Sequence, residues 1–250
     1  MELGKNHLLL DVETANDTRD ALTYDISGLI LSPSGENLIE FSFVVRDIFV
    51  YERELMKQAY YGDKIPEYVR DIQQEKRHMA DFMAVRRYIL NLMKTYECNS
   101  VIAYNCNFDR NALNTTLRYL TKSKYRWFFP YDTEFYCIWN TACHSICQTS
   151  EYKTFAETNY HFSNHGKNYK TSAEVVYQFL TKNSQFQEEH KGLEDVKIEK
   201  EILQNCLENG GELLKINRGC WQKVKRGTLM VPRYFLVNFL AGSWFNIILT

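Results

Sequence analysis

The first apolar stretch of the chain reads His7-Leu8-Leu9-Leu10-Asp11-Val12-Glu13-Thr14. A short apolar run that ends in polar residues predicts a buried strand, which we place over His7–Val12. Side chains two apart on a strand point to the same face, so Asp11 and Glu13 emerge together at the end of this strand. Alone, the pair is a weak signal, because acids also occur at ordinary solvated strand ends.

The segments that follow alternate between strand and helix patterns. We expect strands over Ala21–Leu31, Leu38–Val45, Ser100–Tyr104 and Phe135–Trp139, and helices over Met79–Tyr96, Asp109–Leu120, Thr171–Leu180 and Glu188–Leu207. The turn Ser32-Pro33-Ser34-Gly35 joins the second and third strands into a hairpin. Thr171-Ser172-Ala173-Glu174 has the spacing of a capping box at a helix start. This order predicts an α/β fold with a central mixed sheet flanked by helices.

The composition is that of an ordinary soluble globular protein. The chain has 250 residues, of which 45% are hydrophobic and 24% charged, with a formal net charge of -1. These values exclude a disordered, collagen-like or disulfide-stapled chain, and the total charge gives no general attraction to nucleic acid. Seven cysteines and the absence of a signal-peptide pattern indicate reduced thiols and a cytoplasmic location. A zinc site of Cys143, Cys147, His161 and His165 is a weaker alternative.

Two further motifs place acids at the ends of later elements. Asp109 follows the strand that ends at Tyr104 and lies near the start of the next helix, where a carboxylate is favoured. His190 and Asp195 are five residues apart and therefore cannot share one stripe of a regular helix. We expect His190 in the loop or first turn and Asp195 one turn inside, with Gly192 permitting an irregular start.

Four acids at the ends of elements are together a more specific sign of a metal site than any one of them alone. Asp11, Glu13, Asp109 and Asp195 would repel one another if they converged without a cation, and carboxylate oxygens suit Mg²⁺ or Mn²⁺. Two such ions roughly 4 Å apart would form a clamp for in-line phosphodiester hydrolysis. His190 has an ordinary pKa well matched to accepting a proton from water near neutrality.

The three motifs resemble those of the DEDDh, or DnaQ-like, 3′-5′ exonucleases. They are Leu10-Asp11-Val12-Glu13-Thr14, Asn105-Cys106-Asn107-Phe108-Asp109 and His190-Lys191-Gly192-Leu193-Glu194-Asp195, in the family's order. The chain is similar in particular to phage or bacterial proofreading-subunit-like members. The resemblance implies an RNase H-like fold and two Mg²⁺ or Mn²⁺ held by Asp11, Glu13, Asp109 and Asp195. It also implies that His190 is the general base, that Thr14 holds the 3′-terminal nucleotide and that Phe108 packs beside the site.

The function implied by this resemblance is hydrolysis at nucleic-acid 3′ ends, releasing nucleoside 5′-monophosphates. Single-stranded DNA is the favoured substrate, and a ribonuclease acting on RNA ends is the alternative, because contacts to the 2′-OH leave no reliable sequence mark. A catalytically silent nucleic-acid-binding protein is the non-enzyme alternative. Partners would be DNA or RNA 3′ ends and a DNA polymerase or replication protein, in a bacterium or phage-infected host. The sequence departs from the family at Ala15-Asn16-Asp17 and at Asn140-Thr141, which affects the shape of the cleft.

Residues 211–250 form an extension to an exonuclease domain predicted over residues 1–210. From Leu213 to Thr250 there is no Asp or Glu, whereas the stretch contains Lys215, Arg218, Lys223, Lys225, Arg226 and Arg233. Two basic-aromatic segments, Arg118–Trp127 and Asn217–Tyr234, are candidates for contact with a single strand, and the alternative for each is a solvated surface that flanks a helix. Tyr234–Leu249 is apolar but too short to span a membrane, so we expect a packed terminal element or an oligomer interface.

Overall fold

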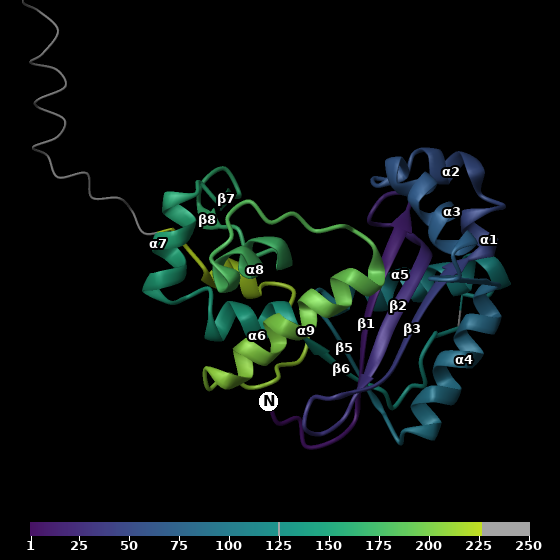
Figure 1. Cartoon of the computed structure of the whole chain (residues 1–250), viewed down its shortest axis with the longest axis horizontal. Helices are drawn as coiled ribbons and strands as arrows, with labels where there is room; N and C mark the ends of the chain where they lie inside the picture. Colours follow the sequence, from purple (N-terminus) through teal and green to yellow (C-terminus); the bar gives the residue numbers. More distant parts are fainter. Residues whose placement is uncertain (125, 227–250) are drawn as a thin grey trace, which may run out of the picture.

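A six-stranded mixed sheet with helices on both faces forms the body of the protein in the computed structural model, which describes residues 1–124 and 126–226 (Figure 1). The strands are β1 His7–Ala15, β2 Leu22–Leu31, β3 Asn37–Val45, β4 His78–Ala80, β5 Ser100–Ala103 and β6 Glu134–Cys137, with a separate hairpin of β7 Phe162–Ser163 and β8 Asn168–Tyr169. The order in the sheet is β4-β3-β2-β1-β5-β6. The α/β class with a central mixed sheet, expected from the sequence, is confirmed.

The helices surround the sheet. They are α1 Arg46–Phe49, α2 Arg53–Lys57, α3 Ile65–Gln73, α4 Phe82–Thr95, α5 Cys106–Thr121, α6 Ile138–Ser145, α7 Ser150–Thr158, α8 Ala173–Thr181 and α9 Gly192–Glu208, with 3-10 turns at Gly62–Lys64 and Cys220–Lys223. Figure 1 shows α1 to α3 at one end of the sheet and α6 to α8 with the small hairpin at the other, while α9 runs between them.

Strand β1 lies inside the sheet and divides two hydrophobic cores. It pairs antiparallel with β2 and parallel with β5. Leu8 and Leu10 belong to the core built with α4 and α5, whereas Leu9 belongs to the core built with α6 and α9. Because side chains alternate along a strand, Asp11 and Glu13 follow Leu9 onto the α9 side. Both acids of β1 therefore lie on the face of the sheet that is covered by α9, the helix that carries Asp195.

Several element ends differ from those expected from the sequence. Helix α5 begins at Cys106, so Asp109 lies within its first turn and does not open it. Strand β6 ends at Cys137, and Trp139 lies in α6. Helix α9 begins at Gly192, which leaves His190 in the preceding loop. Met79 belongs to β4, and α4 starts three residues later.

The predicted capping box at Thr171 is wrong. Ser172 is the N-cap of α8, and no side-chain bond caps that end. Thr171 instead accepts a hydrogen bond on Oγ1 from Trp139 Nε1 at 2.7 Å, and Glu174 Oε2 accepts one from the backbone N–H of Glu188 at 3.2 Å. Both side chains have tertiary partners, which explains why the local capping bonds are absent.

The start of α9 rests on a buried acid of β2. Asp25 is fully buried and accepts hydrogen bonds from Tyr68 Oη at 2.7 Å, Arg77 Nη1 at 2.8 Å and the backbone N–H of Gly192 at 3.2 Å. Arg77 also forms an ion pair with Glu194 on the first turn of α9. This network fixes where the helix begins, and so where its Asp195 lies.

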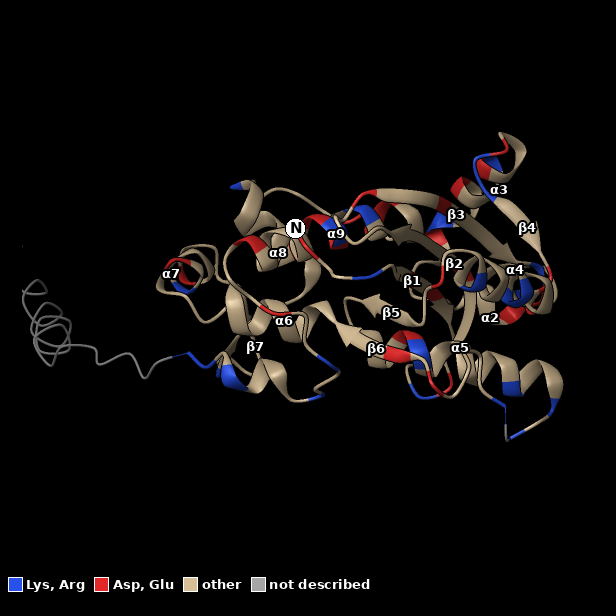
Figure 2. Cartoon of the chain, turned by 90° about the horizontal axis from the view of Figure 1, so that it is seen from below, with Lys and Arg blue, Asp and Glu red and all other residues tan. Residues whose placement is uncertain are grey.

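The described part of the C-terminal extension packs along the body of the protein. Leu214 O accepts a hydrogen bond from Cys137 N–H at 2.8 Å, and Val224 O accepts one from Tyr169 N–H at 3.2 Å. Cys220 and Val224 are fully buried. Figure 2 shows the basic residues of this stretch on the side of α6 and β7. Tyr234–Leu249 lies outside the described residues, and none of the described helices is long and apolar enough to cross a membrane.

Gly192→Ala should destabilise the protein by about 1–3 kcal/mol, because its added Cβ would lie 2.8 Å from Ser27 Cβ and 3.1 Å from Asp25 Oδ1. Urea unfolding would measure this loss. Gly219→Ala is the matched control, since a Cβ there meets its nearest atom at 3.5 Å. Equal unfolding free energies for the two variants would contradict the tight contact at α9.

Candidate active site

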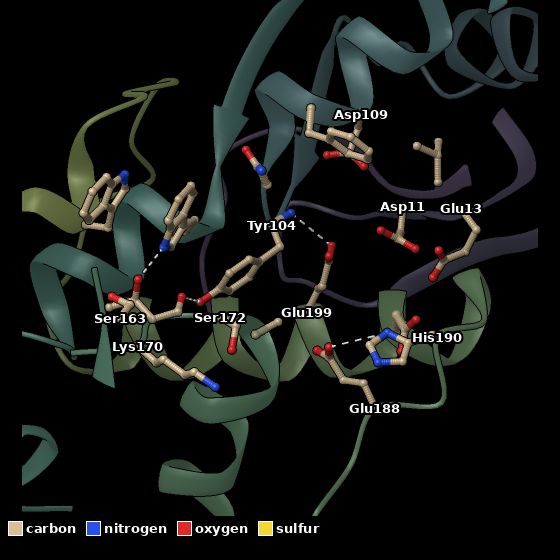
Figure 3. Close-up of a pocket in the computed structure, with 18 of the residues that line it drawn as sticks. Asp11, Glu13, Tyr104, Asp109, Ser163, Lys170, Ser172, Glu188, His190 and Glu199 are labelled. Atoms are coloured by element: carbon tan, nitrogen blue, oxygen red, sulfur yellow. Dashed lines mark hydrogen bonds and ion pairs between the residues drawn. The ribbon is translucent and has the colours of Figure 1, made fainter. Parts of the chain in front are cut away.

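A cavity of about 750 Å³ opens between the sheet, α5, the loop before α9 and the small hairpin (Figure 3). One end is acidic and is lined by Asp11, Glu13, Asp109, Glu188, Asp195 and Glu199, together with His190. The other end is aromatic and polar and is lined by Trp139, Trp221, Ser163, Asn164 and Lys170. The structure therefore brings the four predicted acids and the predicted histidine to one place.

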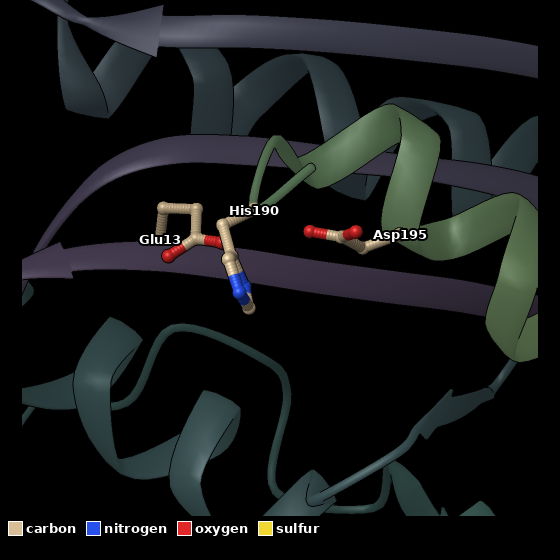
Figure 4. Close-up of side chains that lie close together, drawn as sticks. All are labelled: Glu13, His190 and Asp195. Atoms are coloured by element: carbon tan, nitrogen blue, oxygen red, sulfur yellow. The ribbon is translucent and has the colours of Figure 1, made fainter. Parts of the chain in front are cut away.

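Glu13, His190 and Asp195 meet where the end of β1 faces the start of α9 (Figure 4). One ligand atom from each of the three lies within 4.8 Å of the others. Asp195 is 7% exposed and one turn inside α9, as expected from its spacing to His190. A bulge between Glu13 and Thr14 shifts the register of β1 against β2 at the same point. The site thus forms where regular pairing is interrupted.

Asp109 joins this group from the opposite side. It is 4% exposed in the first turn of α5 and lies near Asp11 at the edge of the cavity. Burial raises the pKa of Asp109 to about 7, although the backbone N–H groups of Asp109 and Val12 act in the other direction. Helix α5 therefore supplies the third acid from its N-terminal end.

The acids raise one another's pKa values. Burial, followed by the charge of Glu199, raises the pKa of Asp11 well above its usual value. Burial, followed by the charge of Asp195, does the same for Glu13. Burial also raises the pKa of Asp195 to about 7 and that of Glu188 to about 8. Without a cation, several of these groups are therefore protonated near neutral pH.

His190 is held in a fixed and uncommon conformation. Its φ of 52° lies in the left-handed region, which residues other than glycine rarely adopt. Its ring stacks on Tyr61, with centroids 4.0 Å apart and planes 13° from parallel. Nδ1 lies 4.0 Å from Glu188 Oε2. Burial lowers the pKa of His190, so the imidazole is neutral near pH 7 and able to accept a proton.

The chemistry of the site suits hard divalent cations. Asp11 Oδ2 and Asp195 Oδ1 are buried and have no hydrogen-bond partner, although buried carboxylate oxygens are normally paired. The nearby metal-binding atoms are mainly carboxylate oxygens, which are the ligands that Mg²⁺ and Mn²⁺ prefer. The residues present therefore fit the two ions expected from the sequence. Among the described residues, the candidate metal groups contain no cysteine, and Cys143 and Cys147 are fully buried.

Sequence reasoning missed Glu188, Glu199 and Tyr61. Glu199 lies four residues after Asp195, so the helical period alone would have placed it on the same stripe of α9. Glu188 precedes His190 in a loop, and Tyr61 comes from the segment between α2 and α3. Nothing in the local sequence indicates that either reaches the cavity.

Of the two residues expected to contact a nucleotide, Phe108 lines the cavity. Thr14 is half-buried beside Glu13 and is not among the described residues that line it. The aromatic end of the cavity comes from chain regions after β6. Trp139 is oriented by its bond to Thr171, and Trp221 is delivered by the C-terminal extension.

The architecture is similar to that of two solved nucleases. Cell-death related nuclease 4 (CRN-4) matches with a TM-score of 0.53 at 13% identity, over 84% of this chain and 66% of that one. E. coli exonuclease I in complex with a 5cy-dA13 oligonucleotide matches with a TM-score of 0.50 at 13% identity, over 83% of this chain and 41% of that one. No protein-family profile matches the sequence, and no curated protein is significantly similar to it. These likenesses show that the fold is RNase H-like.

In the absence of divalent metal, the protein should become less stable as pH rises from about 5.5 to about 8.5. Folding raises the pKa to about 7 for Asp109 and Asp195 and to about 8 for Glu188. In this pH range the folded state therefore binds protons that the unfolded state has already released. This stabilisation is lost as pH passes through the folded pKa values, at about 1.4 kcal/mol per pH unit for each extra proton bound.

Melting temperature measured in EDTA across this pH range tests the prediction. Asp109→Asn should flatten the dependence, because it removes one of the titrating groups, and Mn²⁺ should raise the melting temperature most at the alkaline end. A melting temperature that climbs with pH in EDTA would show that the acids are not crowded in solution.

Proposed function

We propose that this protein is a metal-dependent 3′-5′ exonuclease of the DEDDh type, which releases nucleoside 5′-monophosphates. The observation that carries the proposal is the convergence of Asp11, Glu13, Asp109, Asp195 and His190 on one cavity. These residues come from β1, α5, the loop before α9 and the first turn of α9, which are far apart in the sequence. The RNase H-like fold shared with two nucleases supports a nuclease activity.

In this proposal, the metal centre is held by Asp11, Glu13, Asp109 and Asp195. Two bound Mg²⁺ or Mn²⁺ ions would neutralise these acids and stabilise the charge that develops on the attacking and leaving oxygens. The buried oxygens of Asp11 and Asp195 that lack partners support this assignment. The free energy of folding offsets the repulsion among these like charges, so the acids are already gathered before a cation binds.

His190 acts as the general base. The neutral imidazole takes a proton from water while the water oxygen attacks the terminal phosphorus. The bond from phosphorus to the 3′ oxygen of the preceding nucleotide breaks, and that oxygen receives a proton from solvent. The released nucleotide keeps the phosphate on its 5′ carbon. Stacking on Tyr61 holds the His190 ring in place, and its lowered pKa keeps it unprotonated for this role.

The other end of the cavity suits a single strand. Trp139 and Trp221 offer aromatic faces on which bases can stack, and Lys170 offers a cation for a phosphate. The similar exonuclease I structure contains a dA13 oligonucleotide, which supports DNA as the substrate. RNA 3′ ends are the alternative substrate, because the contacts to the 2′-OH that distinguish RNA leave no reliable mark in the sequence. A DNA polymerase or replication protein as partner, and an oligomer formed through residues 211–250, stay predictions.

Incubation with 5′-labelled single-stranded DNA and RNA oligomers tests the function directly. We expect a ladder that shortens from the 3′ end with Mg²⁺ or Mn²⁺, no cleavage in excess EDTA and no cleavage by Asp11→Ala or Asp109→Ala. His190→Ala should retain metal and substrate binding but lose about 10²–10⁴-fold in kcat, as expected for a general base.

The control for the histidine is His144→Ala, because His144 is exposed on α6 and outside the cavity. It should behave like the parent protein. Cleavage in EDTA, or products with a 3′-phosphate, would defeat the proposed chemistry. Oligomer binding with no cleavage under any metal would favour the silent binding protein.

Trp221→Ala should raise KM for a short single-stranded oligomer by roughly 10-fold or more, with a smaller change in kcat, because base stacking contributes about 1–3 kcal/mol per base. Truncation after Gly211 is not a suitable test, since Cys220 and Val224 are buried and their loss would expose the core. The matched control is Trp127→Ala, whose side chain is 57% exposed and outside this cavity. A larger rise in KM for Trp127→Ala than for Trp221→Ala would indicate that the oligomer binds along Arg118–Trp127 instead.

A further inference from the structure

Glu199 is a buried carboxylate at the floor of the acidic end of the cavity. It lies one helical turn after Asp195 on α9, and this spacing places both on the same face of the helix. Its side chain lines the cavity, and the residue is 4% exposed. Its Oε2 accepts a hydrogen bond from the backbone N–H of Tyr104 at 3.2 Å. This bond aims the carboxylate at the end of β5, beside the acids.

Glu199 and Glu13 approach Asp11 from opposite sides, as Figure 3 shows. Glu13 lies with His190 and Asp195, whose ligand atoms are within 4.8 Å of its own, whereas Asp109 and Glu199 lie on the other side of Asp11 in this view. The acids thus divide into two sets that share Asp11, one with Glu13 and Asp195 and one with Asp109 and Glu199.

A comparison with Asp25 shows what Glu199 lacks. Both carboxylates are buried, but Asp25 has an ion pair with Arg77 and hydrogen bonds from several donors. Glu199 has the Tyr104 N–H, and the charges that act on it most strongly are those of Asp109, Asp195 and Glu188. A buried charge without an opposite charge costs several kcal/mol. Asp11 Oδ2, which is buried and has no hydrogen-bond partner, belongs to the same end of the cavity. A cation bound there would neutralise both carboxylates.

We propose that Glu199 is a fifth metal-binding carboxylate, which with Asp11 and Asp109 holds one of two divalent cations. Glu13 and Asp195, with Asp11, hold the other. This inference rests on the metal centre of the proposed function and adds a ligand that the four-acid motif does not contain. Its consequence is that the ion on the Asp109 side is held by three carboxylates, so it should bind before nucleic acid is present.

Calorimetric titration of the full-length, metal-free protein with Mn²⁺ tests this inference without any measurement of turnover. The parent protein should bind two Mn²⁺ per chain. Glu199→Gln keeps the size of the side chain and its acceptor for Tyr104 N–H but removes the charge. It should bind one Mn²⁺ as before and the other at least about 10-fold more weakly. Glu201→Gln, an exposed acid on the same helix, is the control and should bind like the parent.

Thermal unfolding in EDTA provides a second measurement. Glu199→Gln should melt at a higher temperature than the parent, because one of the crowded charges has gone, and should gain less from added Mn²⁺. Two Mn²⁺ bound with parental affinities in Glu199→Gln would overturn the inference, as would a single site in both proteins. Metal-dependent cleavage of oligomers by the parent is scored separately. Cleavage with an unchanged Glu199→Gln titration refutes the Glu199 assignment alone, whereas a parent that neither binds Mn²⁺ nor cleaves refutes both proposals.

Discussion

The hydrogen bond from Gly192 N–H to the buried carboxylate of Asp25 is the contact on which the arrangement of the site depends. Asp25 is opposite Glu13 in the pairing of β1 with β2, and it is neutralised by Arg77. The bond therefore ties the first turn of α9 to the strand next to the one that carries Asp11. Breaking one partner of such a buried ion pair is strongly destabilising, so α9 has little freedom to move. Asp195 and the loop at His190 take their positions from this anchor.

The two kinds of buried acid in this protein have opposite roles. Asp25 is fully paired and stabilises the fold, whereas Asp11, Asp109, Asp195 and Glu199 repel one another and are tolerated because the sheet and helices hold them together. The proposed function accounts for that second group, since a metal centre would need negative charge assembled before the cation arrives. The left-handed backbone conformation of His190, beside the same acids, adds a further unfavourable contribution to the free energy of folding. The cores on both faces of the sheet therefore stabilise the fold, whereas the crowded acids and the backbone of His190 destabilise it at the cavity.

Most of the sheet and four acids of the site could be predicted because their signals are local. The apolar run before Asp11 and the hairpin turn after Leu31 have short-range patterns that tertiary structure reinforces. The walls of the cavity could not be predicted in this way. Tyr61 and Trp221 reach it from segments with no regular period, and only the folded chain shows that both line one cavity. The capping box at Thr171 failed because Trp139, distant in sequence, competes for the hydroxyl.

The alternation along β1 also limits how this gene can change. Leu8 and Leu10 face one core and Leu9 the other, and the strand is paired on both edges, so it cannot slide to absorb an inserted or deleted codon. One residue gained or lost before Asp11 would turn the acids into the core formed with α4 and α5. Substitution among Leu, Ile and Val at these positions costs far less. Related sequences should therefore often exchange one apolar residue for another in this strand, but should almost never differ in its length.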